Sequence, residues 1–599
     1  MTNYQKVRIG GAAAFLGDSS ISVPQLIRGG KVDYIILDYL AEVTMSLLAR
    51  SKAKRPRMGY APYFVDVIMA QNIRDIAQQG IKIVTNAGGV NPHACRDAIL
   101  KLMAETDASL DLKVAVVDGD DLLPRHDELS RRGLTDMNTG SPWPDNMMSM
   151  NAYLGAKPIA EALDMGADVV ITGRVVDSAL TLGPLMHEFK WQETDYDLLA
   201  AGSMAGHIIE CGAQATGGLF TDWQEVPDWA NIGYPVIECY ADGRFVVSKP
   251  DDTGGIVTPA TVGEQLLYEI GDPQAYLLPD VVCDFSKVKI VQVGDNQVEV
   301  TGVIGQPPPE CYKVYSAYQD GYRCFAISPV IGMNAVQKAE RMAEALIKRT
   351  RLLFQQQNLG DYRDTLVECI GAESAYGPHA RSRDTREVAC KISLEHERPE
   401  ALQIFASEAY APTTSMSPGT TGWFVGKPYV SPIIRLFSFL IPKNEVPFTI
   451  TLNDNSRSFT QSPTEVFNPA SIIRPRVADI TDAGAEMKTV PLVQLAWGRS
   501  GDKGNSCNIG IMARKPEFLP YIRKVLTESA VYEFMNHIFH GAEKPGVERF
   551  DLPGINALNF LLHESLGGGQ MASLRLDPLA KGMAQQLLEF PTPVPVSLL

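Results

Sequence analysis

The stretch Ile81-Lys82-Ile83-Val84-Thr85-Asn86-Ala87-Gly88-Gly89-Val90-Asn91-Pro92 decides the class of fold. It begins with a short apolar run, typical of a strand that is buried on both faces of a parallel sheet. It ends in a glycine-containing loop, and a helix is predicted directly after it, over 93–106. Similar apolar runs lie at 7–11, 33–38, 113–118 and 168–172, with helices predicted over 65–79 and 152–165. This alternation predicts an α/β fold whose N-terminal part is a mostly parallel sheet layered with helices.

The residues that follow these apolar runs are polar or small. Ligands of open α/β sheets bind outside the carboxyl ends of the strands, so we expect a substrate site there. The residues expected to bind substrate are Asp38, Glu42, Asn86, Gly88, Gly89, Asn91, Arg174 and Asp177. The N–H groups of the 86–89 loop are candidate donors to an oxyanion. An ordinary strand-to-helix turn explains this loop equally well.

The chain changes character after about residue 195. Hairpins are predicted at 236–240 with 245–248, around Asp242-Gly243, and at 288–293 with 297–303. Asp-Gly suits the type I′ turn of a hairpin. A long helix is predicted over 334–356, which gives a central mixed α/β region with sub-boundaries near 195–200 and 330–360. Lys249 with Gly254 and Gly255 forms a second candidate loop for holding a phosphate or carboxylate.

A separate C-terminal unit is predicted beyond a core of residues 1–480. The small, polar stretch 481–489 predicts a linker, and residues 490–599 have the size of an independent domain. The order of predicted strands (490–497, 507–513, 547–552, 557–563) and helices indicates an α+β sandwich for this unit.

The stretch 499–505, Arg-Ser-Gly-Asp-Lys-Gly-Asn, is predicted to be a loop between two of these strands. A loop so rich in charged and hydroxyl side chains is typical of a ligand site, so we expect Ser500, Asp502, Lys503 and Asn505 to contact substrate. We also expect this loop to approach the glycine-rich loops of the first domain, because ligand sites favour such junctions. The alternative is a solvated turn.

The stretch His207-Ile208-Ile209-Glu210-Cys211-Gly212-Ala213-Gln214 carries the strongest candidates for catalysis. If it begins as a helix, His207, Glu210 and Cys211 share a face. A histidine beside a cysteine favours the reactive thiolate, and Glu210 would orient the imidazole. Gln214 would bind substrate. The alternative is a buried cysteine at a helix end, with the glycines merely turning the chain.

Composition excludes several other classes of function. Lys and Arg total 54 against 70 Asp and Glu, a formal charge of −16, which argues against nucleic-acid partners. A local basic patch still suits a phosphate-bearing small ligand. No apolar run reaches the length of a membrane span. The nine cysteines contain no CxxC pair, and no metal-ligand set is recognisable, so we expect reduced thiols, no metal and a cytoplasmic protein without membrane contact.

The chain resembles the acyclic terpene utilisation (AtuA) family over nearly its whole length. The strings that carry the resemblance are 38–42 (DYLAE), 58–60 (MGY), 86–89 (NAGG), 166–168 (GAD), 172–174 (TGR), 206–214 (GHIIECGAQ), 249–250 (KP), 254–255 (GG) and 265–269 (QLLYE). The C-terminal unit is similar to the ferredoxin-like domain of this family, through 499–505, 508–510 (NIG) and 573–577 (SLRLD).

This resemblance implies a catabolic role in the degradation of citronellol- and geraniol-type acids as CoA thioesters. The chain would be a lyase or hydratase acting on a 3-hydroxy-3-isohexenylglutaryl-CoA-like intermediate. His207 or Glu210 would be the base and Cys211 an acid or nucleophile, with no cofactor besides the CoA of the substrate. The alternative is a non-catalytic scaffold or metabolite-binding subunit. We also expect a homo-oligomer and association with other catabolic enzymes.

Overall fold

An eleven-stranded sheet forms the centre of the first lobe of the computed structural model, which describes residues 6–422, 426–474 and 486–599. Its middle consists of parallel strands in the order β1 (Lys6–Gly11), β2 (Tyr34–Leu37), β3 (Lys82–Thr85), β6 (Val169–Thr172) and β4 (Val114–Asp118). Antiparallel strands extend both edges: β7 (Val236–Tyr240), β8 (Phe245–Ser248), β12 (Gln297–Thr301) and β11 (Lys289–Gly294) on one, β18 (Phe448–Leu452) and β19 (Asn455–Phe459) on the other. The predicted α/β class and the parallel sheet are confirmed.

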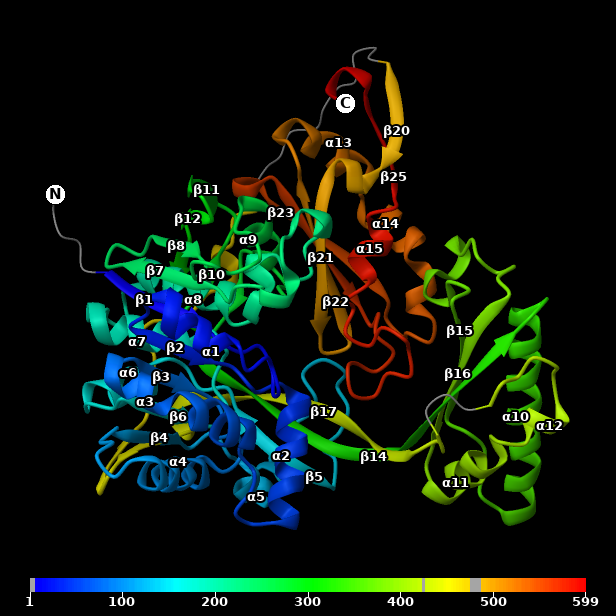
Figure 1. Cartoon of the computed structure of the whole chain (residues 1–599), viewed down its shortest axis with the longest axis horizontal. Helices are drawn as coiled ribbons and strands as arrows, with labels where there is room; N and C mark the ends of the chain where they lie inside the picture. The colour runs from blue at the N-terminus through cyan, green and yellow to red at the C-terminus, as the bar shows by residue number, and fades with distance from the viewer. Residues whose placement is uncertain (1–5, 423–425, 475–485) are drawn as a thin grey trace.

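Helices cover both faces of this sheet (Figure 1). On one face lie α6 (Lys157–Asp164), α7 (Ala179–Phe189) and α8 (Tyr196–Ile209), and on the other α3 (Ala70–Gln79) and α4 (Pro92–Thr106). Each face has its own apolar cluster, which explains the near-continuous Val, Ile and Leu of the strands. The helix predicted over 65–79 divides into a π-helical turn, Phe64–Met69, and α3, and the one predicted over 152–165 begins only at Lys157, after strand β5 (Met147–Ala152).

A single long strand, β14 (Cys311–Ile331), leads from the first lobe into a second one (Figure 1). Its first half pairs with β5 and with β17 (Val430–Pro442), and its second half with β16 (Glu387–His396), beside which lies β15 (Asp364–Ile370). Helices α10 (Ala335–Gln357), α11 (Pro399–Glu408) and α12 (Pro412–Ser415) complete this lobe around its own apolar core. Sequence periodicity predicted α10 to within one residue at each end, but not β14.

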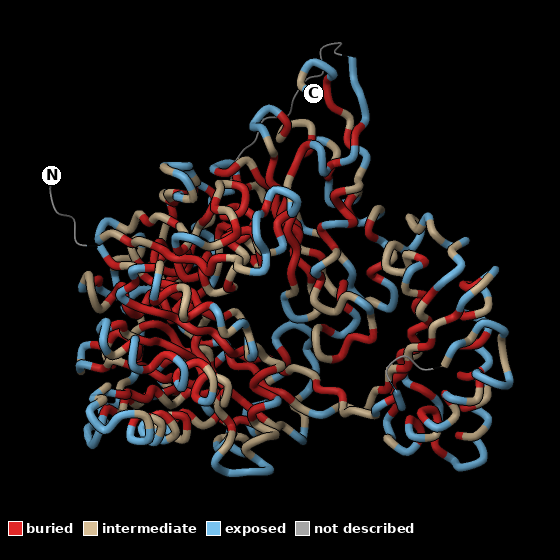
Figure 2. The backbone as a smooth tube through the Cα atoms, viewed as in Figure 1, coloured by how far each residue is buried: buried red, intermediate tan, exposed pale blue. Residues whose placement is uncertain are grey.

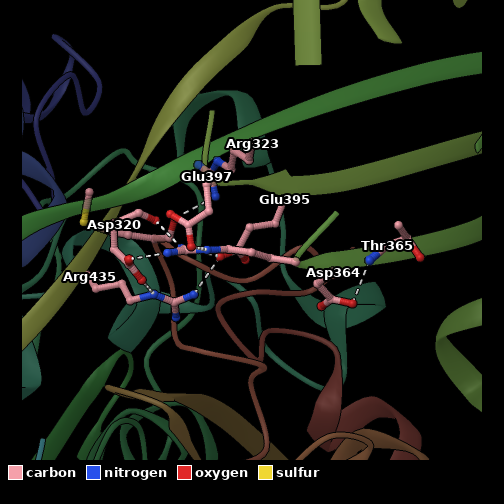
Figure 3. A network of polar contacts seen from close by, with 9 residues as sticks. Asp320, Arg323, Asp364, Thr365, Glu395, Glu397 and Arg435 are labelled. Atoms are coloured by element: carbon pink, nitrogen blue, oxygen red, sulfur yellow. Dashed lines mark hydrogen bonds and ion pairs between the residues drawn. The ribbon is translucent and has the colours of Figure 1, made fainter. Parts of the chain in front are cut away.

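An ion-pair network stabilises β14 where its pairing is interrupted, between Gln319 and Tyr322 (Figure 3). Asp320, in the bulge, accepts hydrogen bonds from Arg435 Nε (2.5 Å) and Arg363 Nη2 (2.9 Å). Both arginines also contact Glu395 on β16. The network therefore joins β14 and β17, which extend between the lobes, to β16 of the second lobe.

The C-terminal domain is an α+β unit with its own core. Its sheet has the order β21 (Ala496–Lys503), β22 (Ser506–Ala513), β24 (Ala557–His563) and β23 (Gly546–Leu552). The domain also contains helices α13 (Leu519–Val525), α14 (Glu528–Phe534) and α15 (Met583–Leu587), and a separate strand pair, β20 (Met487–Pro491) with β25 (Pro591–Pro595).

The linker predicted for 481–489 is wrong at its end, since Met487–Pro491 is a strand; 481–485 lie outside the described residues. The loop predicted for 499–505 is also wrong, because β21 continues through Lys503.

The C-terminal sheet packs on α9 (Pro259–Leu266) and on the segment after it. Buried residues are found in the first lobe and in the neighbouring strands β21 and β22 (Figure 2). Arg499 on β21 forms an ion pair with Glu264 on α9 (3.0 Å), and both side chains are almost inaccessible to solvent. Asn508 on β22 donates to Leu267 O and accepts from the N–H of Glu269. Polar bonds in a buried contact demand one geometry, so this docking is specific. Among the described residues, no helix is long and apolar enough to cross a membrane.

Candidate functional site

A cluster of charged side chains lies at the carboxyl end of β6 and the start of α2 (Glu42–Lys54). Glu42 accepts a hydrogen bond from the Tyr153 hydroxyl (2.6 Å), and the guanidinium of Arg174 lies 4.3 Å from the centroid of the same ring. Arg174 Nη1 donates to Asp177 (2.7 Å), whereas its buried Nε has no partner among the described residues. An unpaired buried donor is costly, so this nitrogen is a candidate ligand contact.

Lys313 on β14 joins this cluster, with its Nζ 5.7 Å from the centroid of the Tyr153 ring. The residue is exposed, but desolvation by surrounding protein lowers the pKa of its ammonium, helped by the charges of Lys503 and Arg174. Burial by itself raises the pKa of Glu42, but the charges of Arg174 and Lys313 outweigh it, so the pKa is lowered and Glu42 is ionised.

Asp38 and Asn86 have mainly structural partners. Asn86 is fully buried, donates to Asp38 Oδ1 (2.6 Å) and accepts from the N–H of Tyr39 (2.8 Å), which fastens the ends of β2 and β3 together. Burial and the charge of Asp177 raise the pKa of Asp38 well above its usual range. Asn86 therefore positions the Asp38 carboxyl, whose Oδ1 also accepts from the N–H of Leu40.

The expectation that the 86–89 loop supplies oxyanion donors does not fit the structure. The N–H groups of Ala87, Gly89 and Asn91 donate to Thr85 Oγ1, Asn86 O and Gly88 O, respectively. A Cβ atom added at Gly88 would lie 2.5 Å from Thr172 O, so the turn has no space for a side chain there. The amide of Asn91 donates to Pro56 O and Met58 O. This loop is a closed turn that holds neighbouring segments, which is the alternative the sequence left open.

His207 and Glu210 form a hydrogen-bonded pair at the end of α8. His207 Nδ1 lies 3.2 Å from Glu210 Oε1, and its Nε2 lies 3.2 Å from Leu266 O. A carbonyl only accepts, so the hydrogen bond to Leu266 O requires a proton on Nε2, and the other ring nitrogen, Nδ1, faces the carboxyl of Glu210. Both ring nitrogens are thus occupied, and His207 is fully buried, whereas the Glu210 side chain is 11% exposed. Glu210, with a pKa raised by burial, is the member of the pair that can reach a substrate.

The thiol of Cys211 is not activated. Burial raises its pKa well above the usual range, and the charges of Glu210 and Glu269 add to the shift. The nucleophilic thiolate expected here therefore does not fit, because a thiol in these surroundings stays protonated. A role as a neutral proton donor is compatible with this state.

The C-terminal domain contributes charged groups to the same region. Lys503 Nζ lies 5.9 Å from the centroid of the Tyr276 ring, which is 5.8 Å from the ring of His207. Lys581 forms an ion pair with Glu269 (3.5 Å). Burial and the charge of Glu269 raise the pKa of Asp502 to about 7, although Lys581 opposes the shift. The end of β21 thus approaches the first lobe at Tyr268 and Tyr276, and its approach to the glycine-rich loop at 86–89 stays a prediction.

Comparison of the sequence with protein-family models gives two matches. Residues 7–452 match the acyclic terpene utilisation family protein AtuA, and residues 490–593 match the AtuA ferredoxin-like domain. The chain belongs to the AtuA family. No curated protein and no solved structure matches it. The first two lobes thus correspond to the AtuA model and the C-terminal unit to its ferredoxin-like domain.

Several residues expected in the AtuA site have other partners. Ser500 donates to Ala580 O and accepts from the N–H of Ala584, Gln214 accepts from Arg499, and Asn505 accepts from the N–H of Gly568. These three stabilise the ferredoxin-like domain and its docking.

Lys249, Gly254 and Gly255 lie in another part of the fold. Lys249 donates to Thr253 O (2.6 Å) and lines a polar cavity of about 560 Å³ with Arg8 and Lys31. The N–H groups of Gly254 and Gly255 donate to backbone carbonyls. Within the described residues, no hydrogen bond or ion pair joins these three to the cluster around Glu42, so the structure does not bring them into the site.

Sequence reasoning missed Tyr153, Tyr276, Lys313 and Lys581 as members of the site. They come from β5, β9 (Tyr276–Leu277), β14 and a loop before α15, and none stands in a pattern that marks chemistry. Glu269 belongs to one of the strings that carry the family resemblance, 265–269, and this was the only feature of the sequence that pointed to it. Within the described residues, no group of three or more His, Cys, Asp or Glu side chains is arranged to hold a metal ion.

Proposed function

We propose that this AtuA protein is a hydratase or lyase of branched acyl-CoA substrates of acyclic terpene degradation, with carboxyl groups as general acid and base. Membership of the family implies involvement in acyclic terpene utilisation. The supporting observation is that neighbouring carboxyls have divergent pKa values: that of Glu42 is lowered, and that of Asp502 is raised to about 7. Such divergence separates a base from an acid at neutral pH.

Both reactions need these two groups. In a dehydration, a carboxylate takes the proton next to the thioester carbonyl, and a carboxylic acid protonates the departing hydroxyl, which leaves as water. In a carbon–carbon cleavage, a carboxylate takes the hydroxyl proton, the bond breaks, and a carboxylic acid protonates the resulting enolate. Arg174 and Lys503 would hold the substrate carboxylate or the carbonyl oxygen that gains charge.

The test is turnover of a panel of branched 3-hydroxyacyl- and enoyl-CoA thioesters, followed by mass spectrometry in D₂O. We expect conversion, with deuterium incorporated next to the thioester carbonyl. Asp502→Asn should reduce kcat by about a hundredfold or more, the usual contribution of a general acid or base. Asp384→Asn, an exposed aspartate of the second lobe, is the matched control and should leave kcat unchanged. No conversion of any member would count against the proposal.

A metabolite-binding subunit is the second candidate. It is favoured by the unactivated thiol of Cys211 and by the occupied ring nitrogens of His207. A subunit of this kind would be stabilised thermally by the same thioesters without converting them. It would also raise the activity of a pathway enzyme only when both proteins are present.

A further inference from the structure

A strongly basic segment lies at the far end of α2, the helix that begins with Glu42. Between Val43 and Val65 the chain has no Asp or Glu, and within this stretch the cations are Arg50, Lys52, Lys54, Arg55 and Arg57. The whole chain has a formal charge of −16, whereas these eight residues contain five cations and no anion. We refer to residues 50–57 as the basic segment.

In the described part of the chain, no carboxylate forms an ion pair with a cation of the basic segment, although the charge of Lys52 acts on the carboxyl of Asp121. Lys54, Arg55 and Arg57 are exposed. Cations at a helix C-terminus stabilise the helix dipole, which accounts for Lys52 and Lys54. It does not account for Arg55 and Arg57, which lie beyond the last helical residue.

The basic segment is held in place rather than free. Asn91 donates to Pro56 O (3.1 Å) and Met58 O (2.8 Å), and Lys52 Nζ donates to Val90 O (2.5 Å). The N–H of Met58 donates to Arg55 O, which closes a turn. Like charges repel, so the four other cations, fixed close together without ion-pair partners, are suited to bind a polyanion.

The geometry points to the phosphate-bearing end of CoA as the ligand of the basic segment, an inference that rests on the proposed function. Glu42 and Lys54 are separated by twelve residues of α2, which is about 18 Å at 1.5 Å per residue. The pantetheine arm is a chain of about thirteen bonds between sulfur and phosphorus and extends over on the order of 15 Å. A thioester beside Glu42 therefore allows the diphosphate and the 3′-phosphate to reach the basic segment.

The test measures CoA binding by calorimetry for wild type and for Arg50→Gln/Lys54→Gln/Arg55→Gln/Arg57→Gln. Glutamine keeps much of each side chain and removes the charge, and Lys52 is retained because it supports the Val90 loop. The control variant is Lys287→Gln/Lys289→Gln/Arg341→Gln/Lys348→Gln, which removes four exposed cations elsewhere. We expect affinity for CoA to fall about tenfold or more in the first variant and to stay unchanged in the control.

Salt and ligand series distinguish the outcomes. Wild type should bind CoA less tightly as salt increases, and should bind dephospho-CoA more weakly than CoA; both differences should shrink in the first variant. Equal affinity in both variants overturns the assignment even if the thioester panel is converted. Loss of CoA binding in the first variant without any conversion supports the assignment and refutes the enzyme. Binding of phosphatidylserine vesicles or of a random RNA by the basic segment, with CoA binding unaffected, also overturns it.

Discussion

At the scale of the residue, Asp502 links the proposed acid catalysis to pH-dependent stability. Its pKa rises from 3.8 to about 7 on folding, so folding favours its protonated form. The resulting stability is present below about pH 4 and is lost as pH rises through 7, when the carboxylate ionises beside Glu269. Asp502→Asn should therefore raise the free energy of unfolding at pH 8 by about 1–3 kcal/mol and change it little at pH 4. Denaturant unfolding at the two pH values measures this, and an equal effect at both would contradict the pKa shift.

At the scale of the element, the contact between β21 and α9 depends on one buried ion pair. Arg499→Met leaves the Glu264 carboxylate buried without its partner, which should destabilise the protein by about 3–5 kcal/mol. Arg499→Met/Glu264→Gln should recover much of this loss, since glutamine still accepts from the N–H of Thr221. Arg381→Met, which breaks an exposed pair with Glu589, is the control and should cost less than about 1 kcal/mol. Thermal unfolding of the three variants measures these differences, and similar losses for Arg499→Met and Arg381→Met would refute a buried docking pair.

At the scale of the whole molecule, the C-terminal domain has a core of its own and also contributes apolar side chains to the core of the first lobe. Met512, Leu552 and Ile555 belong to the same apolar cluster as Leu266 and Leu267. Deletion of residues 486–599 exposes this surface and leaves Glu264 unpaired, so the remaining chain should aggregate. The separate fragment 486–599 should fold, since its core is local. Solubility and circular dichroism of the two fragments test this, and a soluble, cooperatively unfolding 1–485 would contradict it.

Local patterns in the sequence determined the parallel sheet, the ends of β7 and β8 around Asp242-Gly243, and most of α10. These features depend on neighbours within a few residues, so periodicity and turn chemistry are sufficient to predict them. The polar loops at the carboxyl ends of the strands were also predicted, because this edge follows from the topology.

Only the tertiary structure decided which polar residues gather in the candidate site and how their pKa values are shifted. Arg499 and Ser500 have the composition of a ligand loop, but both are buried in β21 by partners far away in the sequence. The pKa values of Cys211 and Asp502 are set by burial and by charges from other segments. Desolvation and Coulomb interactions depend on distance in space, and the sequence alone does not give that distance.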